Sequence, residues 1–199
     1  MITHQNGVFH IQTESYSYLF KIDDYGIPEH LHFGMPVGTD LYYGTYDDKG
    51  RIHPAVRVDE KGTKYDLCTI CQEVNTPYGG DYYEPSLVLC YANGNRRSDL
   101  LYTGHEIFAE KPMPEGLPGI RKGETLAVYL AAKDVKVTLF YTVSDTTATI
   151  IRSMKVENLG KEPVRVERAY SYSVELPNKP FKAVYLSGAT AIETQWSEA

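Results

Sequence analysis

Apolar and polar residues alternate along much of the chain with a period of two, the pattern of β-strands that have one buried face. The clearest example is Val135–Val143, where Val, Val, Leu, Tyr and Val share one face and Lys, Thr, Phe and Thr share the other. Over no stretch of a dozen residues do apolar positions keep the spacing of a helix. The pattern therefore predicts an all-β chain and excludes a helix-rich catalytic barrel within these residues.

The predicted strands follow one another at short intervals broken by turn residues, which is typical of antiparallel sheets. Thr125–Leu130 is predicted to pair with Val135–Val143, and Asn93-Gly94 predicts a hairpin after Leu87–Tyr91. The remaining predicted strands are Val8–Thr13, Ser15–Ile22, Glu29–Phe33, Thr149–Glu157, Val164–Glu175 and Phe181–Leu186. Roughly ten strands with this spacing indicate a large antiparallel β-sandwich.

Two long connections interrupt the strands. His105–Ile120 holds Pro112, Pro114 and Pro118, so we expect an ordered crossing between two sets of strands, through which neither a long helix nor a central strand runs. Gly34–Lys64 is rich in glycine, tyrosine and charged turn residues. Loops of that length are usually functional or disordered, and we expect this one to project toward a partner or ligand.

Composition and charge exclude several classes of function. The chain has 199 residues, 42% of them hydrophobic, and a net charge of −6 from acidic and basic residues that are mixed along it. No basic run is longer than Arg96-Arg97, so neither nucleic acid nor an anionic membrane is predicted as a partner. The opening residues lack a charged segment followed by an apolar one, and no apolar run is long enough to cross a bilayer. We expect a cytoplasmic protein.

Candidate metal ligands are few. His30 and His32, two positions apart on a predicted strand, would share a face, but no third ligand can be named. Cys68 and Cys71 form a lone C-x-x-C without the other two ligands of a structural zinc site or the βαβ setting of a redox motif, and Cys90 is the remaining thiol. No metal and no cofactor is predicted, and the thiols are expected to be buried or half-buried.

A tyrosine-rich loop is the one candidate binding surface. Tyr78, Tyr82 and Tyr83 stand beside Asp81 and Glu84, a combination on which a sugar ring could stack while acids accept its hydroxyl hydrogens. Ordinary packing at a strand end is the simpler interpretation. The paired acids elsewhere lie in turns, where adjacent carboxylates cannot flank a glycosidic bond. No catalytic residue is assigned.

Several segments in order resemble the N-terminal domain of α-galactosidases of glycoside hydrolase family 36. They span nearly the whole chain, and the most specific is Lys111-Pro112 followed by Gly116-Leu117-Pro118. The others are Gly80-Asp81-Tyr82-Tyr83-Glu84-Pro85, Glu124-Thr125-Leu126, Val137-Thr138-Leu139-Phe140-Tyr141, Ile151-Arg152-Ser153, Glu157-Asn158-Leu159-Gly160, Arg168-Ala169-Tyr170-Ser171 and Leu186-Ser187-Gly188-Ala189.

The resemblance implies a supersandwich similar to galactose mutarotases and a role in enzymes that hydrolyse terminal α-D-galactosides with retention. In that family the two catalytic aspartates lie in a barrel that follows this domain, and these residues include no barrel. We therefore expect residues 1–199 to be a non-catalytic domain, lacking its last strands, which packs against its own catalytic barrel and helps to build a homo-oligomer. Unpaired strand edges would make the isolated chain self-associate.

Two other functions stay open. A free-standing carbohydrate-binding module would use Tyr78, Tyr82 and Tyr83. A mutarotase-like epimerase would need a Glu and a His facing one cavity, and the sequence nominates neither.

Overall fold

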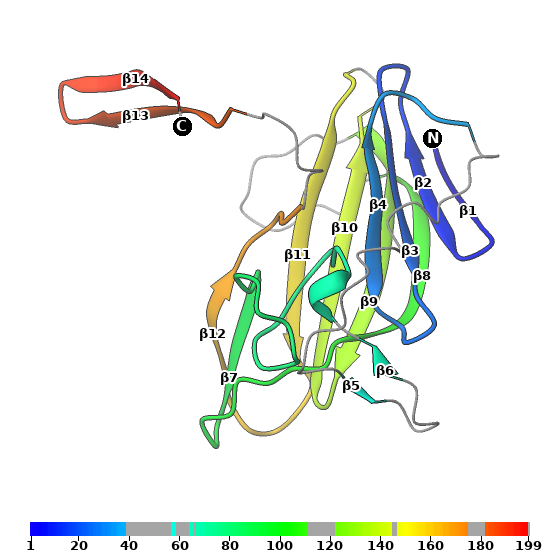
Figure 1. Ribbon diagram of the computed structural model, residues 1–199, viewed down its shortest axis with the longest axis vertical. Helices are drawn as coiled ribbons and strands as arrows, with labels where there is room; N and C mark the ends of the chain where they lie inside the picture. Colours follow the sequence, from blue (N-terminus) through cyan, green and yellow to red (C-terminus); the bar gives the residue numbers. More distant parts are fainter. Residues whose placement is uncertain are drawn as a thin grey trace.

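The first layer is a four-stranded antiparallel sheet at the N-terminus, with strand order β1-β2-β3-β4 (Figure 1). Its strands are β1 (Ile2–Gln5), β2 (Val8–Gln12), β3 (Ser17–Ile22) and β4 (Pro28–Gly34). In the β3–β4 pair Leu19 lies opposite His32 and Phe20 lies opposite His30, so Leu31 of β4 is an extra residue that forms a bulge. The computed structural model describes residues 1–38, 57–58, 64–65, 67–110, 122–144, 147–174 and 182–198.

The second layer is a longer antiparallel sheet with strand order β11-β10-β9-β8. Its strands are β8 (Leu101–Glu110), β9 (Lys122–Ala132), β10 (Val135–Val143) and β11 (Ile150–Asn158). The predicted pairing of β9 with β10 is confirmed, with Leu130 opposite Val137 and Lys133 in a left-handed turn conformation. The apolar residues at the odd positions of β10 are at most 5% exposed, as predicted, but Thr138 and Thr142 on the other face are buried as well, at 2% and 0%.

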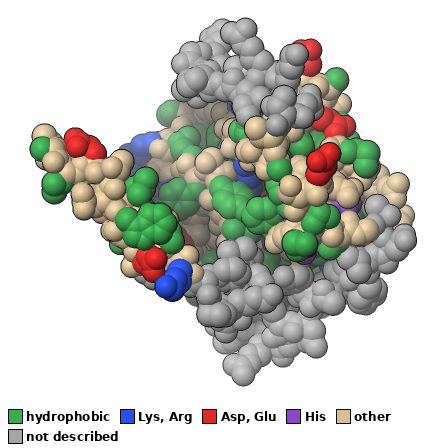
Figure 2. Space-filling model, turned by 90° about the horizontal axis from the view of Figure 1, so that it is seen from above, with side chains coloured by type: hydrophobic (Ala, Val, Ile, Leu, Met, Phe, Trp, Pro, Cys, Tyr) green, Lys and Arg blue, Asp and Glu red, His purple; other side chains and the backbone are tan. Residues whose placement is uncertain are grey.

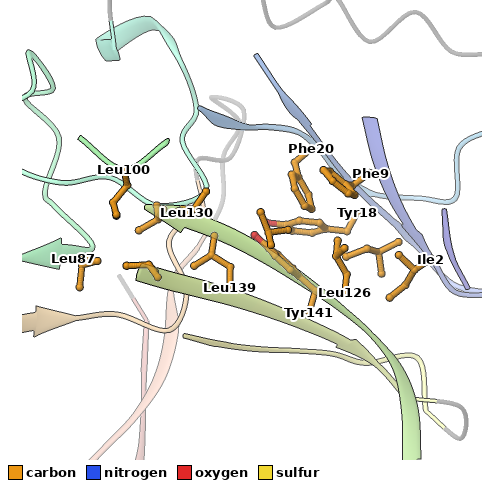
Figure 3. Close-up of a cluster of buried hydrophobic side chains, with 14 of the residues drawn as sticks. Ile2, Phe9, Tyr18, Phe20, Leu87, Leu100, Leu126, Leu130, Leu139 and Tyr141 are labelled. Carbon is orange, nitrogen blue, oxygen red and sulfur yellow. The ribbon is translucent and has the colours of Figure 1, made fainter. Parts of the chain in front are cut away.

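The core lies where the two sheets face each other. The rings of Phe9 and Phe20 stack with centroids 4.8 Å apart, and Phe20 stacks on Tyr141 of the other sheet at 5.1 Å. Figure 3 shows these rings together with Ile2 and Leu126 filling the space between the layers. Burying each such side chain contributes about 1.5–3 kcal/mol, so this contact accounts for the pairing of the sheets.

Smaller β units extend the two layers. The pair of β7 (Leu87–Tyr91) and β12 (Val164–Ala169) adds Leu87 and Leu89 to the same core. The hairpin of β13 (Val184–Ala189) and β14 (Ile192–Glu198) instead stands away from the rest of the molecule (Figure 1). The other elements are β5 (Arg57–Val58), β6 (Lys64–Tyr65) and the 3₁₀ turn η2 (Leu67–Thr69). The predicted all-β antiparallel architecture is therefore confirmed.

Two predictions about connections are wrong. Asn93-Gly94 does form a turn, with the Gly94 N–H donating to the Tyr91 carbonyl at 2.8 Å, but β7 pairs with β12 and not with the next strand. The chain instead crosses to the second sheet, where Leu101 pairs with Ala131. His105–Glu110, the first part of the predicted crossing, belongs to edge strand β8, because the prolines begin only at Pro112. Residues 111–121 lie outside the described residues.

Other strand bounds also differ from the prediction. Strands β1 and β14 were not predicted, and β12 ends at Ala169 instead of Glu175. The last predicted strand, Phe181–Leu186, is observed at Val184–Ala189, and the described residues 182 and 183 are not in a strand. Most of the predicted Gly34–Lys64 excursion lies outside the described residues. No helix in the described part of the chain is long and apolar enough to span a membrane.

Candidate functional site

The predicted tyrosine loop forms an exposed surface next to a small polar pocket. Tyr78 and Tyr82 are 69% and 68% exposed, and Tyr83 is 47% exposed. Tyr78 has a φ of 67°, a left-handed conformation that is uncommon for a residue other than glycine. A pocket of about 180 Å³ is lined by Asp81, Tyr83 and Glu84 with Gln72, Asn75 and Ser173. Tyr78 and Tyr82 do not line it.

The acids of this loop are held by neighbouring groups. The Asp81 carboxylate accepts hydrogen bonds from Gln72 Nε2 and from the Tyr83 backbone N–H, both at 2.8 Å. Arg168 donates to the Glu84 carboxylate. The Tyr83 hydroxyl donates to the Cys68 carbonyl at 3.2 Å. The structure therefore brings three of the five predicted residues to one pocket, where the acids also serve to fix the loop.

A buried carboxylate, Glu73, joins the two sheets and was not predicted. It accepts hydrogen bonds at 2.7 Å from the hydroxyls of Tyr18 on β3 and Tyr141 on β10, and Figure 3 shows these two hydroxyls close together between the layers. His30 Nδ1 lies 2.9 Å and Arg152 Nη1 3.2 Å from the carboxylate. The Glu73 side chain is 0% exposed, so four partners compensate for the loss of its hydration.

The backbone places Glu73 at this position. Its N–H donates to the Pro28 carbonyl at 2.9 Å, and the His30 N–H donates to the Cys71 carbonyl at 2.6 Å. The segment that ends at Glu73 thus pairs with β4, which directs the carboxylate into the space between the sheets. Arg152 also donates to the Glu73 carbonyl, so the ion pair is held through both side chain and backbone.

The charges of this cluster set its protonation states. Burial acts to raise the pKa of Glu73, but Arg152 and the hydrogen bond from His30 outweigh it, and the pKa lies below its ordinary value. Burial and the nearby Glu73 carboxylate raise the pKa of Tyr18 and of Tyr141 well above 10.0. The cluster is therefore an ionised Glu–Arg pair that two neutral tyrosines solvate.

The structure separates the two histidines that were considered as metal ligands. His30 is buried against Glu73, whereas His32 Nε2 lies 3.0 Å from the Met35 carbonyl on the outside. The bulge at Leu31 lies between these two residues on β4, and it disrupts the period of two that would have put both rings on one face. No three His, Cys, Asp or Glu side chains within the described segments are grouped to hold a metal.

His30 and Glu73 are a histidine and a glutamate in contact, as an epimerase would need, but both lie beneath the surface. His30 is 4% exposed and Glu73 1%, and neither lines a cavity described here. The one sequence signal for this cluster is Arg152, a charged residue that follows Ile150 and Ile151 on a predicted strand.

Curated relatives of the chain are α-galactosidases. Alpha-galactosidase 1 of Pediococcus pentosaceus is 29% identical over 197 residues, which cover 94% of this chain and 27% of the relative. AgaA of Geobacillus stearothermophilus is also 29% identical, and its match covers 98% of this chain and 27% of the relative. The chain thus spans about a quarter of the length of these relatives.

Solved structures share the fold. The crystal structure of AgaA from Geobacillus stearothermophilus superimposes with a TM-score of 0.88 at 27% identity, over 96% of this chain and 27% of that chain. AgaB from the same organism gives a TM-score of 0.87 at 27% identity, over 100% of this chain and 28% of that chain. The pattern of the glycosyl hydrolase family 36 N-terminal domain matches residues 26–199. Nearly nine tenths of the sequence thus carries that pattern, and the chain belongs to the family of glycosyl hydrolase family 36 N-terminal domains.

Proposed function

We propose that the chain is the non-catalytic N-terminal domain of an enzyme that hydrolyses terminal α-D-galactosyl residues of oligosaccharides. The observation that carries the proposal is the match to the N-terminal quarter of α-galactosidases. A variant of Geobacillus AgaA was solved in complex with raffinose, which supports an oligosaccharide as the substrate class of the whole enzyme. In this proposal the catalytic carboxylates belong to a barrel that follows the domain.

The state of the domain's own acids supports a non-catalytic role. A retaining glycosidase needs two carboxyl groups about 5–5.5 Å apart across a substrate pocket. Glu73 is sealed between the sheets in an ion pair with Arg152, and the Asp81 oxygens accept hydrogen bonds from the protein itself. These acids are engaged in holding the fold.

The exposed hairpin β13–β14 is the surface that we assign to packing against the rest of such an enzyme. Leu186, Ile192 and Trp196 are 63%, 59% and 67% exposed on it, and Tyr185 is 52% exposed. Apolar side chains gathered on one projecting element mark an interaction surface. We propose that strands completing the domain and the catalytic barrel cover this surface, and that domains of this kind help to assemble a homo-oligomer.

The chain's three cysteines support a cytoplasmic location in the same proposal. Cys68, Cys71 and Cys90 all lie in described segments, and none of them is in a disulfide. Thiols of this kind suit a reducing compartment.

A chimeric enzyme tests the proposal. The chain would replace the corresponding N-terminal quarter of Geobacillus AgaA, and hydrolysis of 4-nitrophenyl α-D-galactopyranoside would be measured. We expect activity from the chimera and none from the 199-residue chain alone. Trp196→Asp in the hairpin should lower the yield of active chimera, whereas the control Leu159→Asp, at a leucine outside the hairpin that is 68% exposed, should not. Turnover by the purified chain alone would refute the non-catalytic assignment.

A carbohydrate-binding module remains the second candidate, favoured by the exposed tyrosines beside the Asp81–Glu84 pocket. Calorimetric titration with galactose and with raffinose distinguishes the two functions. A module gives saturable heat that Tyr82→Ala abolishes, and a packing domain gives none.

A further inference from the structure

A larger cavity opens at the end of the sandwich where β3 and β11 begin and β4 and β10 end. Its volume is about 370 Å³, and its walls include Tyr16, Tyr18, Phe33, Tyr141, Tyr172 and Arg152. Figure 2 looks onto this end of the molecule and shows a hollow with hydrophobic side chains around it and basic ones among them. The cavity is separate from the Asp81–Glu84 pocket, because the two share no lining residue.

The walls are mainly aromatic carbon held in fixed positions. The ring of Phe33 lies 5.8 Å from that of Tyr16 and 5.6 Å from that of Tyr18, between centroids. The Arg152 guanidinium lies over the rings of Tyr141 and Tyr172, at 5.1 Å and 5.5 Å from their centroids. An apolar cavity of roughly 150 Å³ is enough to hold benzene. The cavity here can therefore hold an aromatic ring with a substituent.

Two polar atoms on the cavity residues lack a partner. The Tyr16 hydroxyl and Arg152 Nε have almost no accessible surface, and neither meets hydrogen-bond geometry with a partner in the described residues, although the Thr13 side chain lies near the Tyr16 hydroxyl. The Arg152 side chain as a whole is only 6% exposed. Such orphaned groups cost free energy, and a ligand that offers an acceptor gives either one a partner after a small side-chain adjustment. The cavity thus has a mainly apolar wall, with two hydrogen-bond donors of its lining residues beneath the surface.

The charges of Arg152 and Glu73 favour a ligand whose hydrogen-bond acceptor is neutral. Glu73 already lies 3.2 Å from Arg152 Nη1 and compensates its charge, so an anionic ligand would meet the Glu73 carboxylate across the guanidinium. A sugar is also disfavoured, because none of the described residues lining this cavity is an Asp, Asn, Glu or Gln that could satisfy its several hydroxyls. Such residues line the other, smaller pocket.

We propose that the cavity binds a small neutral aromatic molecule that carries one hydrogen-bond acceptor, such as an aryl ketone. Its ring would lie among Tyr18, Phe33 and Tyr172, and its acceptor would take a hydrogen bond from Tyr16 or Arg152. This is a second site of the chain, unrelated to the galactosyl group that the proposed parent enzyme would cleave.

A titration of the 199-residue chain followed by tyrosine fluorescence and amide NMR shifts tests the ligand class. Acetophenone, benzoate and methyl α-D-galactopyranoside serve as probes with a neutral acceptor, an anionic acceptor and a sugar. We expect saturable shifts around Phe33 and Ile150 with acetophenone, at least tenfold weaker binding of benzoate, and no response at these residues to the galactoside. Absence of a saturable acetophenone response, equal binding of benzoate, or binding of the galactoside here would overturn the proposal.

Three variants test how the ligand is oriented in the cavity. Tyr16→Phe deletes only the unpartnered hydroxyl, so it should weaken acetophenone binding roughly threefold to tenfold and leave toluene binding unchanged. The matched control Tyr185→Phe makes the same change on the exposed hairpin and should alter neither. Thr149→Trp, at an exposed lining position, should block both ligands while the far-UV spectrum stays that of the parent. Loss of toluene binding in Tyr16→Phe, or unchanged binding in Thr149→Trp, would contradict the assigned cavity.

Discussion

Two hairpins of the chain have nearly the same local structure and opposite surroundings. β9–β10 and β13–β14 are both antiparallel pairs joined by two-residue turns, with Lys133 and Ala191 in left-handed conformations. Leu139 on β10 is 1% exposed, whereas Leu186 on β13 is 63% exposed. The comparison shows that local sequence is enough to form a strand pair, and that burial depends on whether a second layer is available to cover it.

The Glu73 cluster lies in the covered region, between the two sheets. Removing its carboxylate should have the largest effect on the free energy of unfolding. Glu73→Ala leaves Arg152 buried without a counter-charge and the Tyr18 and Tyr141 hydroxyls without an acceptor. We expect a loss of about 3–5 kcal/mol in the free energy of unfolding, measured by urea denaturation. Glu84→Ala is the control, because its side chain is 70% exposed in a similar Arg pair, and it should cost less than about 1 kcal/mol. Equal losses would mean that Glu73 does not join the sheets.

The two leucines test the comparison directly. Leu139→Ala removes packing from the core and should cost about 2–5 kcal/mol in urea unfolding. Leu186→Ala should change the same quantity by no more than about 0.5 kcal/mol, since its side chain is already in water. A large effect at Leu186 would show that the hairpin is covered in the isolated chain, for example by a second copy.

Acid should destabilise the fold, because it protonates the Glu73 carboxylate between the two sheets. Because the pKa of Glu73 is lower in the folded chain than in the unfolded one, its contribution is fully present above the unfolded value of 4.5 and is lost as the pH falls through the folded value. We expect the free energy of unfolding to decrease as the pH falls below about 5. Glu73→Gln, which cannot titrate, should make this decrease shallower. An unchanged slope would assign the acid sensitivity to other carboxyl groups.

The smallest effect is expected at an exposed ion pair. Arg96 and Arg165 hydrogen-bond Glu167 and lower its pKa to about 2. Arg96→Ala should raise that pKa toward its ordinary value in an NMR titration and leave the urea midpoint unchanged, since water screens the pair. A shifted midpoint would indicate that this surface contributes more to stability than its exposure implies.

Much of the strand pattern could be predicted because alternation is a local signal. The face of β10 and its pairing with β9 follow from the order of residues in Val135–Val143 and the turn before it. The partner of β7 could not be predicted in this way. Asn93-Gly94 forms its turn, yet β7 pairs with β12 more than seventy residues later, and that choice depends on core contacts such as Leu87 and Leu89.

The tyrosine loop could be predicted from residues that are close in sequence, whereas the Glu73 cluster could not. Asp81, Tyr83 and Glu84 are neighbours in sequence, so their shared pocket could be proposed from composition. Glu73, Tyr18 and Tyr141 are 55 and 68 residues apart in sequence and meet only when both sheets form. The Glu–Arg pair therefore gave no signal beyond a charged Arg152 next to Ile150 and Ile151 on a predicted strand.

Native-state amide hydrogen exchange of the 199-residue chain tests most directly whether a covering layer distinguishes the two hairpins. The account predicts slow exchange for the amides of Val135–Val143 at a rate set by global unfolding, and fast exchange, through local opening, for those of Val184–Ala189 and Ile192–Glu198. Equal protection of both hairpins at low protein concentration would contradict it.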